Sequence, residues 1–153
     1  MNGTKQAMLR SRNTFLLTLA AGACLSLCCA AAELTVNVTG ITAPFGSVGC
    51  SLFSNEAGFP MDSSRAKTEW VSVSGDTANC KFKDVASGRF SVSVAHDING
   101  NRKVDTNLFG IPTEQWGVSN NVRPTLRAPR FDEAAFNIPG DAPNLSIEIK
   151  VAK

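Results

Sequence analysis

The chain has 153 residues, with 15 Lys and Arg, 13 Asp and Glu, and a single His. A chain of this length is enough for one domain. Charged residues make up 18% of the sequence, and they form no basic stripe of the kind that nucleic-acid-binding proteins carry. We therefore expect no nucleic-acid partner.

The first 32 residues have the pattern of a signal peptide. Basic residues at 5, 10 and 12 precede an apolar run over 15–27, and three alanines follow at 30–32. Small residues in this position mark a cleavage site, so we expect cleavage between Ala32 and Glu33 and a periplasmic or secreted domain over 33–153. The apolar run is shorter than the roughly 20 residues of a membrane span, so a transmembrane anchor is the weaker alternative. A lipid anchor at Cys24, Cys28 or Cys29 ranks second, because none has the residue pattern of a lipoprotein signal before it.

Two cysteines, Cys50 and Cys80, remain after this cleavage, which leaves 12 Lys and Arg against 13 Asp and Glu. An exported protein lies in an oxidising compartment where a pair of cysteines can form a disulfide. Each cysteine lies on the apolar side of its expected strand. We predict a Cys50–Cys80 disulfide, with two separate buried thiols as the alternative.

Apolar and polar residues alternate along most of the mature chain, as in strands with one buried face. In the strand expected over 69–75, for example, Val71 and Val73 lie on one face and Trp70 on the other. Single helical turns are expected near 55–58 or 132–135. The expected strands cover 33–40, 47–54, 69–75, 79–85, 88–96 and 144–152, with a weaker one over 135–138.

About seven short strands separated by Gly, Pro, Asn and Asp clusters predict an all-β protein. Their apolar faces must bury against one another, so the fold class we predict is an antiparallel β-sandwich, immunoglobulin-like or prealbumin-like.

A long polar segment, 96–121, interrupts the strand pattern. Its first part, "DINGNRKVD", places oxygen side chains where a calcium loop has them, and calcium takes six to eight oxygen ligands. Two positions depart from such a loop: Arg102 replaces the turn glycine, and Leu108 stands where a bidentate Glu is usual. The candidate ligands are Asp97, Asn99, Asn101, Asp105 and the backbone carbonyl of Lys103. The alternative is an Asn-Gly turn in which Asp and Asn bind their own backbone.

The same segment contains the only His and several carboxylates. His96 is expected at a strand end, bonded to the following loop, since no nucleophile or partner is placed beside it. A carboxylate-based hydrolase using Asp97, Asp105 or Glu114 near His96 is the enzymatic alternative, although sequence spacing does not define a cleft between carboxylates.

The second part, "FGIPTEQWGVSNN", is a candidate recognition segment. An aromatic ring beside amide and hydroxyl side chains suits contact with a sugar or peptide. The alternative is that Trp116 closes the open end of the sandwich. The candidate ligand-binding residues are His96, Glu114, Trp116, Ser119, Asn120 and Asn121.

The segments "GRFSVSVAHDINGN", "DTNLFGIPTE", "GVSNN" and "PRFDEAAF", which lie within 82–138, resemble the motifs of the bacterial family catalogued as domain of unknown function 2141. The resemblance covers nearly the whole mature chain, and Arg102 stands where members often carry Gly. The resemblance implies a compact extracytoplasmic sandwich of the prealbumin or carboxypeptidase-regulatory type. It does not indicate an activity.

We expect a non-enzymatic binding or accessory module of the cell envelope, with an envelope protein or glycan as its partner. Calcium is the candidate cofactor. A hydrolase and a purely structural domain are the alternatives.

Overall fold

The structure is a computed structural model that describes residues 32–108, 111–140 and 144–153. The predicted signal peptide, apart from Ala32, lies outside these ranges, and so do the lipid-anchor candidates. Within them, the helical segments are single turns, and none could cross a bilayer.

The described chain forms eight strands, because apolar residues alternate along it as predicted. The weak strand expected at 135–138 is present, and a three-residue strand at Trp116 was not predicted. The strands are β1 (Ala32–Thr39), β2 (Ser47–Phe53), β3 (Lys67–Ser72), β4 (Ala78–Val85), β5 (Gly88–Asp97), β6 (Trp116–Val118), β7 (Phe136–Ile138) and β8 (Asn144–Lys150). The helical turns are η1 (Ser63–Arg65), η2 (Ser119–Asn121) and α1 (Phe131–Ala134).

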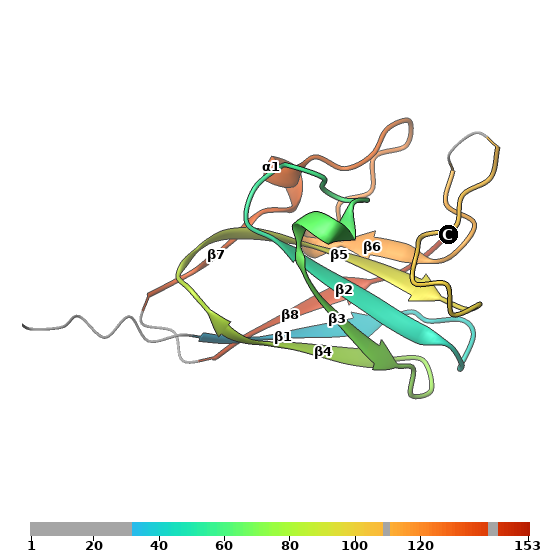
Figure 1. Ribbon diagram of the computed structural model, residues 1–153, viewed down its shortest axis with the longest axis horizontal. Coiled ribbons are helices and arrows are strands. Elements are labelled where there is room, and N and C mark those ends of the chain that lie inside the picture. The colour runs from blue at the N-terminus through green and yellow to red at the C-terminus, as the bar shows by residue number, and fades with distance from the viewer. Residues whose placement is uncertain (1–31, 109–110, 141–143) are drawn as a thin grey trace, which may run out of the picture.

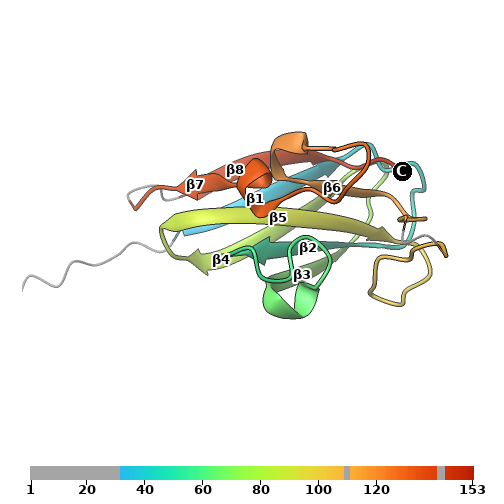
Figure 2. The same cartoon turned by 90° about the horizontal axis from the view of Figure 1, so that it is seen from above.

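The strands form two sheets that face each other (Figures 1 and 2). One has the order β4-β1-β8, and the other has the order β3-β2-β5-β6, with β7 also paired to β5. All pairs are antiparallel except β1 and β8, which run parallel. The predicted β-sandwich is therefore confirmed, with eight strands rather than about seven and one parallel pair.

The core lies between the two sheets and consists of the inward side chains of their strands. Val36 and Phe82 come from the three-stranded sheet, and Val48 and Val92 come from the larger sheet. The predicted disulfide is present: Cys50 of β2 and Cys80 of β4 are fully buried and join the two sheets, with Cα atoms 6.3 Å apart.

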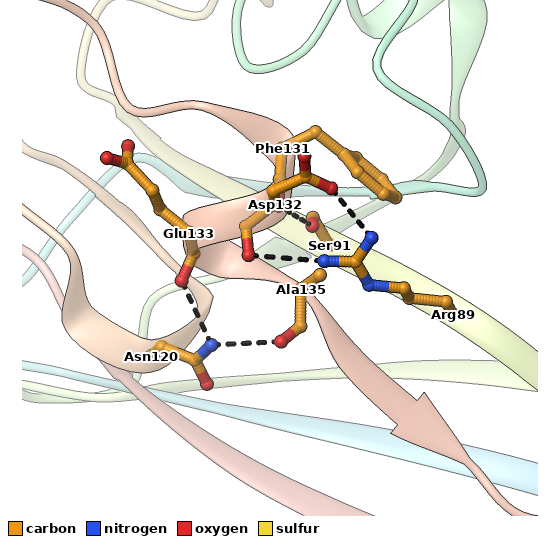
Figure 3. A network of polar contacts seen from close by, with 7 residues as sticks. All are labelled: Arg89, Ser91, Asn120, Phe131, Asp132, Glu133 and Ala135. Atoms are coloured by element: carbon orange, nitrogen blue, oxygen red, sulfur yellow. Dashed lines mark hydrogen bonds and ion pairs between the residues drawn. The ribbon is translucent and has the colours of Figure 1, made fainter.

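The turn α1, expected near 132–135, is held against β5 by a polar network (Figure 3). The Arg89 guanidinium donates to the Asp132 carboxylate at 2.6 Å, and the Ser91 hydroxyl donates to the Phe131 carbonyl at 2.8 Å. The Arg127 guanidinium binds both oxygens of Glu133 and, with the Arg130 backbone amide, lowers the pKa of Glu133 to about 2. This corner of the fold is therefore fixed by contacts within the chain.

Candidate functional site

The 97–105 turn is organised around the carboxylate of Asp97. Asp97 ends β5 and is fully buried. Its Oδ1 accepts from the backbone amides of Gly100 at 2.8 Å and Asn101 at 3.3 Å, and its Oδ2 accepts from the amide of Arg102 at 2.8 Å. A buried carboxylate needs such donors, so Asp97 fixes the backbone up to Arg102.

Asp105 closes the other side of the turn. Its two carboxylate oxygens accept from the side-chain amides of Asn99 at 2.6 Å and Asn101 at 2.8 Å. The Oδ1 atoms of Asn99 and Asn101 accept from the backbone amides of Asn101 and Lys103. The four predicted side-chain ligands thus lie in one turn, each hydrogen-bonded within it, and Lys103, whose backbone carbonyl is the fifth predicted ligand, lies in the same turn.

Among the described residues, no three Asp, Glu, His or Cys side chains lie close enough together to hold a metal ion by themselves. Calcium binding by the turn would depend on amide and backbone oxygens as well, and it stays a prediction.

Glu114 and His96 are both buried, and their side chains form hydrogen bonds to the backbone of other segments. Glu114 accepts from the backbone amide of Ile98 at 2.9 Å and from that of Asp105 at 3.3 Å, so it holds the two ends of the turn together. His96 Nε2 lies 2.9 Å from the carbonyl oxygen of Phe45. That carbonyl can only accept, so Nε2 carries the proton. The bond joins β5 to the segment before β2 rather than to the following loop.

Ser119, Asn120 and Asn121 connect the predicted recognition segment to the rest of the fold. The Ser119 hydroxyl donates to the Ala134 carbonyl at 2.6 Å. The Asn120 amide donates to the carbonyls of Glu133 and Ala135, as Figure 3 shows, and Asn121 Oδ1 accepts from the Lys150 amide. These side chains hold α1 and β8 in place.

Trp116 belongs to a row of residues that crosses the outer face of the larger sheet. The strand registers align Trp70 of β3 with Gly49 of β2, Gly49 with Ala95 of β5, and Ala95 with Trp116 of β6. Residues in such a row point to the same face of a sheet. Three strand spacings of about 4.8 Å place the backbones of the two tryptophans roughly 14 Å apart, with only Gly and Ala between them.

The side chain of Trp70 lies across Gly49. A Cβ atom at position 49 would stand 2.7 to 2.8 Å from three atoms of the Trp70 ring, closer than packed atoms allow. Glycine at this position therefore permits the ring to lie against the sheet.

A hollow of about 280 Å³ lies on this face, and we call it the tryptophan groove. Its floor continues into a second cross-strand row, where Ser51 pairs with both Thr68 and Ser93. The Ser51 and Thr68 hydroxyls are hydrogen-bonded at 2.9 Å, whereas the Ser93 hydroxyl has no hydrogen-bond partner among the described residues. The groove is lined by Gly49, Ser51, Pro60, Met61, Ser63, Trp70, Ser93, Val94, Ala95, Arg102, Lys103, Val104, Trp116, Gly117 and Val118.

The 97–105 turn contributes one rim of this groove through Arg102, Lys103 and Val104. Arg102 has a φ of 58°, a left-handed conformation, and its guanidinium lies 6.0 Å from the centre of the Trp70 ring. The Asp97 carboxylate binds the Arg102 backbone amide, so the buried acid and the exposed cation belong to one structural unit. None of Asp97, Asp105 and Glu114 lines the groove.

Sequence reasoning included Trp116 and Lys103 among its candidates and missed Gly49, Trp70, Ala95 and Arg102 as members of one site. One feature of the sequence could have indicated the groove. The outward positions of the strands expected over 47–54 and 88–96 carry Gly, Ser and Ala, where long polar side chains are usual. Trp70 was placed on an outward face, but its position opposite Gly49 depends on the strand register.

Comparison with known protein families gives a match. A family model described as an uncharacterised protein conserved in bacteria (DUF2141) matches residues 36–146. No curated protein and no solved structure is significantly similar to the chain.

Proposed function

The chain belongs to this bacterial family, and we propose that it is a non-enzymatic binding module of the cell envelope that holds a saccharide in the tryptophan groove. The observation that carries the proposal is the row Trp70–Gly49–Ala95–Trp116, in which the Trp70 ring lies over Gly49 and Trp116 stands on the far side of Ala95. Small-ligand sites combine such apolar walls with a few polar groups, and the unpartnered Ser93 hydroxyl of the described floor supplies one.

The ligand class follows from the chemistry of the lining. A sugar ring has apolar C–H faces that pack on indole rings, and hydroxyls at its edge that bond to groups such as Ser93. The groove volume of about 280 Å³ lies just below the range for ligand sites, roughly 300–1,000 Å³, which suits a small ligand of one or two sugar rings. Glycoside hydrolysis uses two carboxylates beside the scissile bond, and the described lining contains none, which favours binding over cleavage.

An envelope location is supported by the disulfide, because such bonds persist in oxidising compartments. The signal-peptide pattern over 1–32 points the same way.

Tryptophan fluorescence provides a direct test. The chain has two tryptophans and no tyrosine, and both tryptophans line the groove. We expect neutral and acidic disaccharides to change the emission saturably, with Kd values of about 1 mM or below. Trp70→Ala should weaken binding about tenfold, which corresponds to about 1.4 kcal/mol. Phe45→Ala, which removes another exposed aromatic ring, is the matched control and should leave binding unchanged.

Two outcomes would overturn the saccharide site. In one, no disaccharide changes the emission at concentrations well above 1 mM. In the other, Trp70→Ala binds as tightly as the unaltered chain while Phe45→Ala does not.

Weak calcium binding by the 97–105 turn is a second proposal, favoured by the oxygen-bearing side chains of Asp97, Asn99, Asn101 and Asp105 in one turn. Extracellular modules with few carboxylates bind calcium with Kd values of about 10⁻⁴–10⁻³ M. Calcium at ten times Kd should stabilise the fold by about 1.4 kcal/mol and raise the melting temperature relative to a chelator. Equal melting temperatures in millimolar calcium and in chelator would contradict this proposal.

A further inference from the structure

The charged groups that line the tryptophan groove are of one sign. Arg102 and Lys103 lie on its rim, and no Asp or Glu occurs among the described residues that line it. From this charge complementarity we infer that the groove selects acidic saccharides, with the sugar carboxylate bound by Arg102. This inference rests on the saccharide site proposed above and adds its chemical class.

Arg102 differs from most other arginines of the fold in its partners. Arg65, Arg89 and Arg127 each pair with a carboxylate, and Arg123 donates to backbone carbonyls. The Arg102 guanidinium has neither a hydrogen bond nor an ion pair within the described ranges, and it stands over the Trp70 ring. Its five N–H donors are therefore available, and a guanidinium binds a carboxylate through two parallel hydrogen bonds.

The backbone of Arg102 is held by the turn, and its guanidinium lies beside the groove wall. Asp97 holds the Arg102 backbone amide at 2.8 Å, and the guanidinium stands over Trp70 at 6.0 Å from the ring centre. That distance is at the outer end of the cation–π range. A sugar packed on the groove walls would thus meet a cation at the rim beside Trp70.

The test compares a uronic acid disaccharide with its methyl ester, which has the same rings and hydroxyls but no charge. Tryptophan emission of the full mature chain follows both titrations. We expect the acid to bind about tenfold more tightly than the ester at low salt, and added salt to weaken binding of the acid alone. Arg102→Gly should abolish the difference between the two ligands.

Arg102→Gly is a suitable variant because a φ of 58° is a conformation that glycine adopts readily. It removes the cation while leaving the backbone amide for Asp97, so we expect the melting temperature to change little. Arg102→Lys keeps the charge and should retain part of the preference for the acid. Lys83→Gln, which removes an exposed cation from β4 of the other sheet, is the control and should change neither affinity.

The outcomes separate this inference from the proposal beneath it. Equal affinity for acid and ester in the unaltered chain overturns the charge selection and leaves the saccharide site standing. A preference for the acid that persists in folded Arg102→Gly also overturns it. Failure of both ligands to bind overturns the two proposals together.

Discussion

The 97–105 turn and the tryptophan groove adjoin each other and use their polar groups in opposite ways. In the turn, the side chains of Asp97, Asn99, Asn101 and Asp105 all bond within the turn itself. In the groove, Ser93 and the guanidinium of Arg102 have no hydrogen-bond partner among the described residues. The carboxylates and amides of the turn are thus occupied with its own structure, whereas the Arg102 side chain of the turn and Ser93 of the sheet stay available to a ligand.

The largest effect is expected when the interactions within the turn are removed by replacing Asp97. Asp97→Ala leaves three backbone amides without their acceptor, and burial prevents water from replacing it fully. We expect a loss of about 3 to 5 kcal/mol in the free energy of unfolding, measured by urea denaturation. Asp76→Ala, at an exposed turn residue, is the control and should change stability by less than about 0.5 kcal/mol. Equal stability of the two variants would show that Asp97 does not organise the turn.

The disulfide lies beneath the groove, because Cys50 points into the core between the outward residues Gly49 and Ser51. Replacing Cys50 and Cys80 by Ala should lower the free energy of unfolding by about 3 kcal/mol, since the bond closes a loop of about 30 residues. Saccharide affinity, measured well below the unfolding transition, should stay the same. A large loss of affinity in the folded variant would mean that the core bond, and not the strand register alone, shapes the groove.

Replacing Gly49 should have the opposite effect to removing the disulfide: saccharide affinity should fall while stability changes little. In Gly49→Ala the new Cβ would meet the Trp70 ring at 2.7 to 2.8 Å, so the half-buried ring must move away from the sheet. We expect a saccharide affinity about tenfold lower, a changed emission spectrum, and a loss of about 1 kcal/mol or less in stability. Gly140→Ala is the matched control, because its Cβ would make only ordinary contacts at 3.7 Å. Unchanged emission and affinity in Gly49→Ala would contradict the placement of Trp70.

The smallest effect is the pH dependence of stability at the α1 corner, which lies outside both the 97–105 turn and the tryptophan groove. The Arg127 guanidinium, followed by the Arg130 backbone amide, lowers the pKa of Glu133 from its ordinary value of 4.5 to about 2. A lowered pKa in the folded state gives stability that is present above about pH 4.5 and is lost as the pH falls toward 2. Glu133→Gln should therefore flatten the change in melting temperature between pH 5 and pH 2. An identical pH dependence in the variant would rule out this ion pair as a source of acid sensitivity.

Much of the fold could be predicted from the sequence because alternation is a local signal. The strand containing Leu34, Val36 and Val38 and the disulfide between inward cysteines follow from it directly. Strand β6 was missed because its three residues, Trp116–Val118, are too few to show a period of two. The parallel pairing of β1 with β8 joins the two ends of the domain, and no local pattern encodes it.

The candidate site was harder to predict, because it depends on register across four strands. Alternation places Trp70 and Gly49 on outward faces, but only the pairing of β2 with β3 sets them opposite each other. The same limit applies to Asp97, whose burial requires the turn to fold back over the end of β5. Composition drew attention to the turn, whereas geometry shows the groove beside it.

The most direct test of the central claim is to map the bound ligand by amide and indole chemical shifts during a titration with the uronic acid disaccharide. We predict that the largest shifts occur at the indole N–H groups of Trp70 and Trp116, at the amide of Ser93 and at the Arg102 side chain. Shifts confined to the three-stranded sheet, or to Ser119–Asn121, would contradict it.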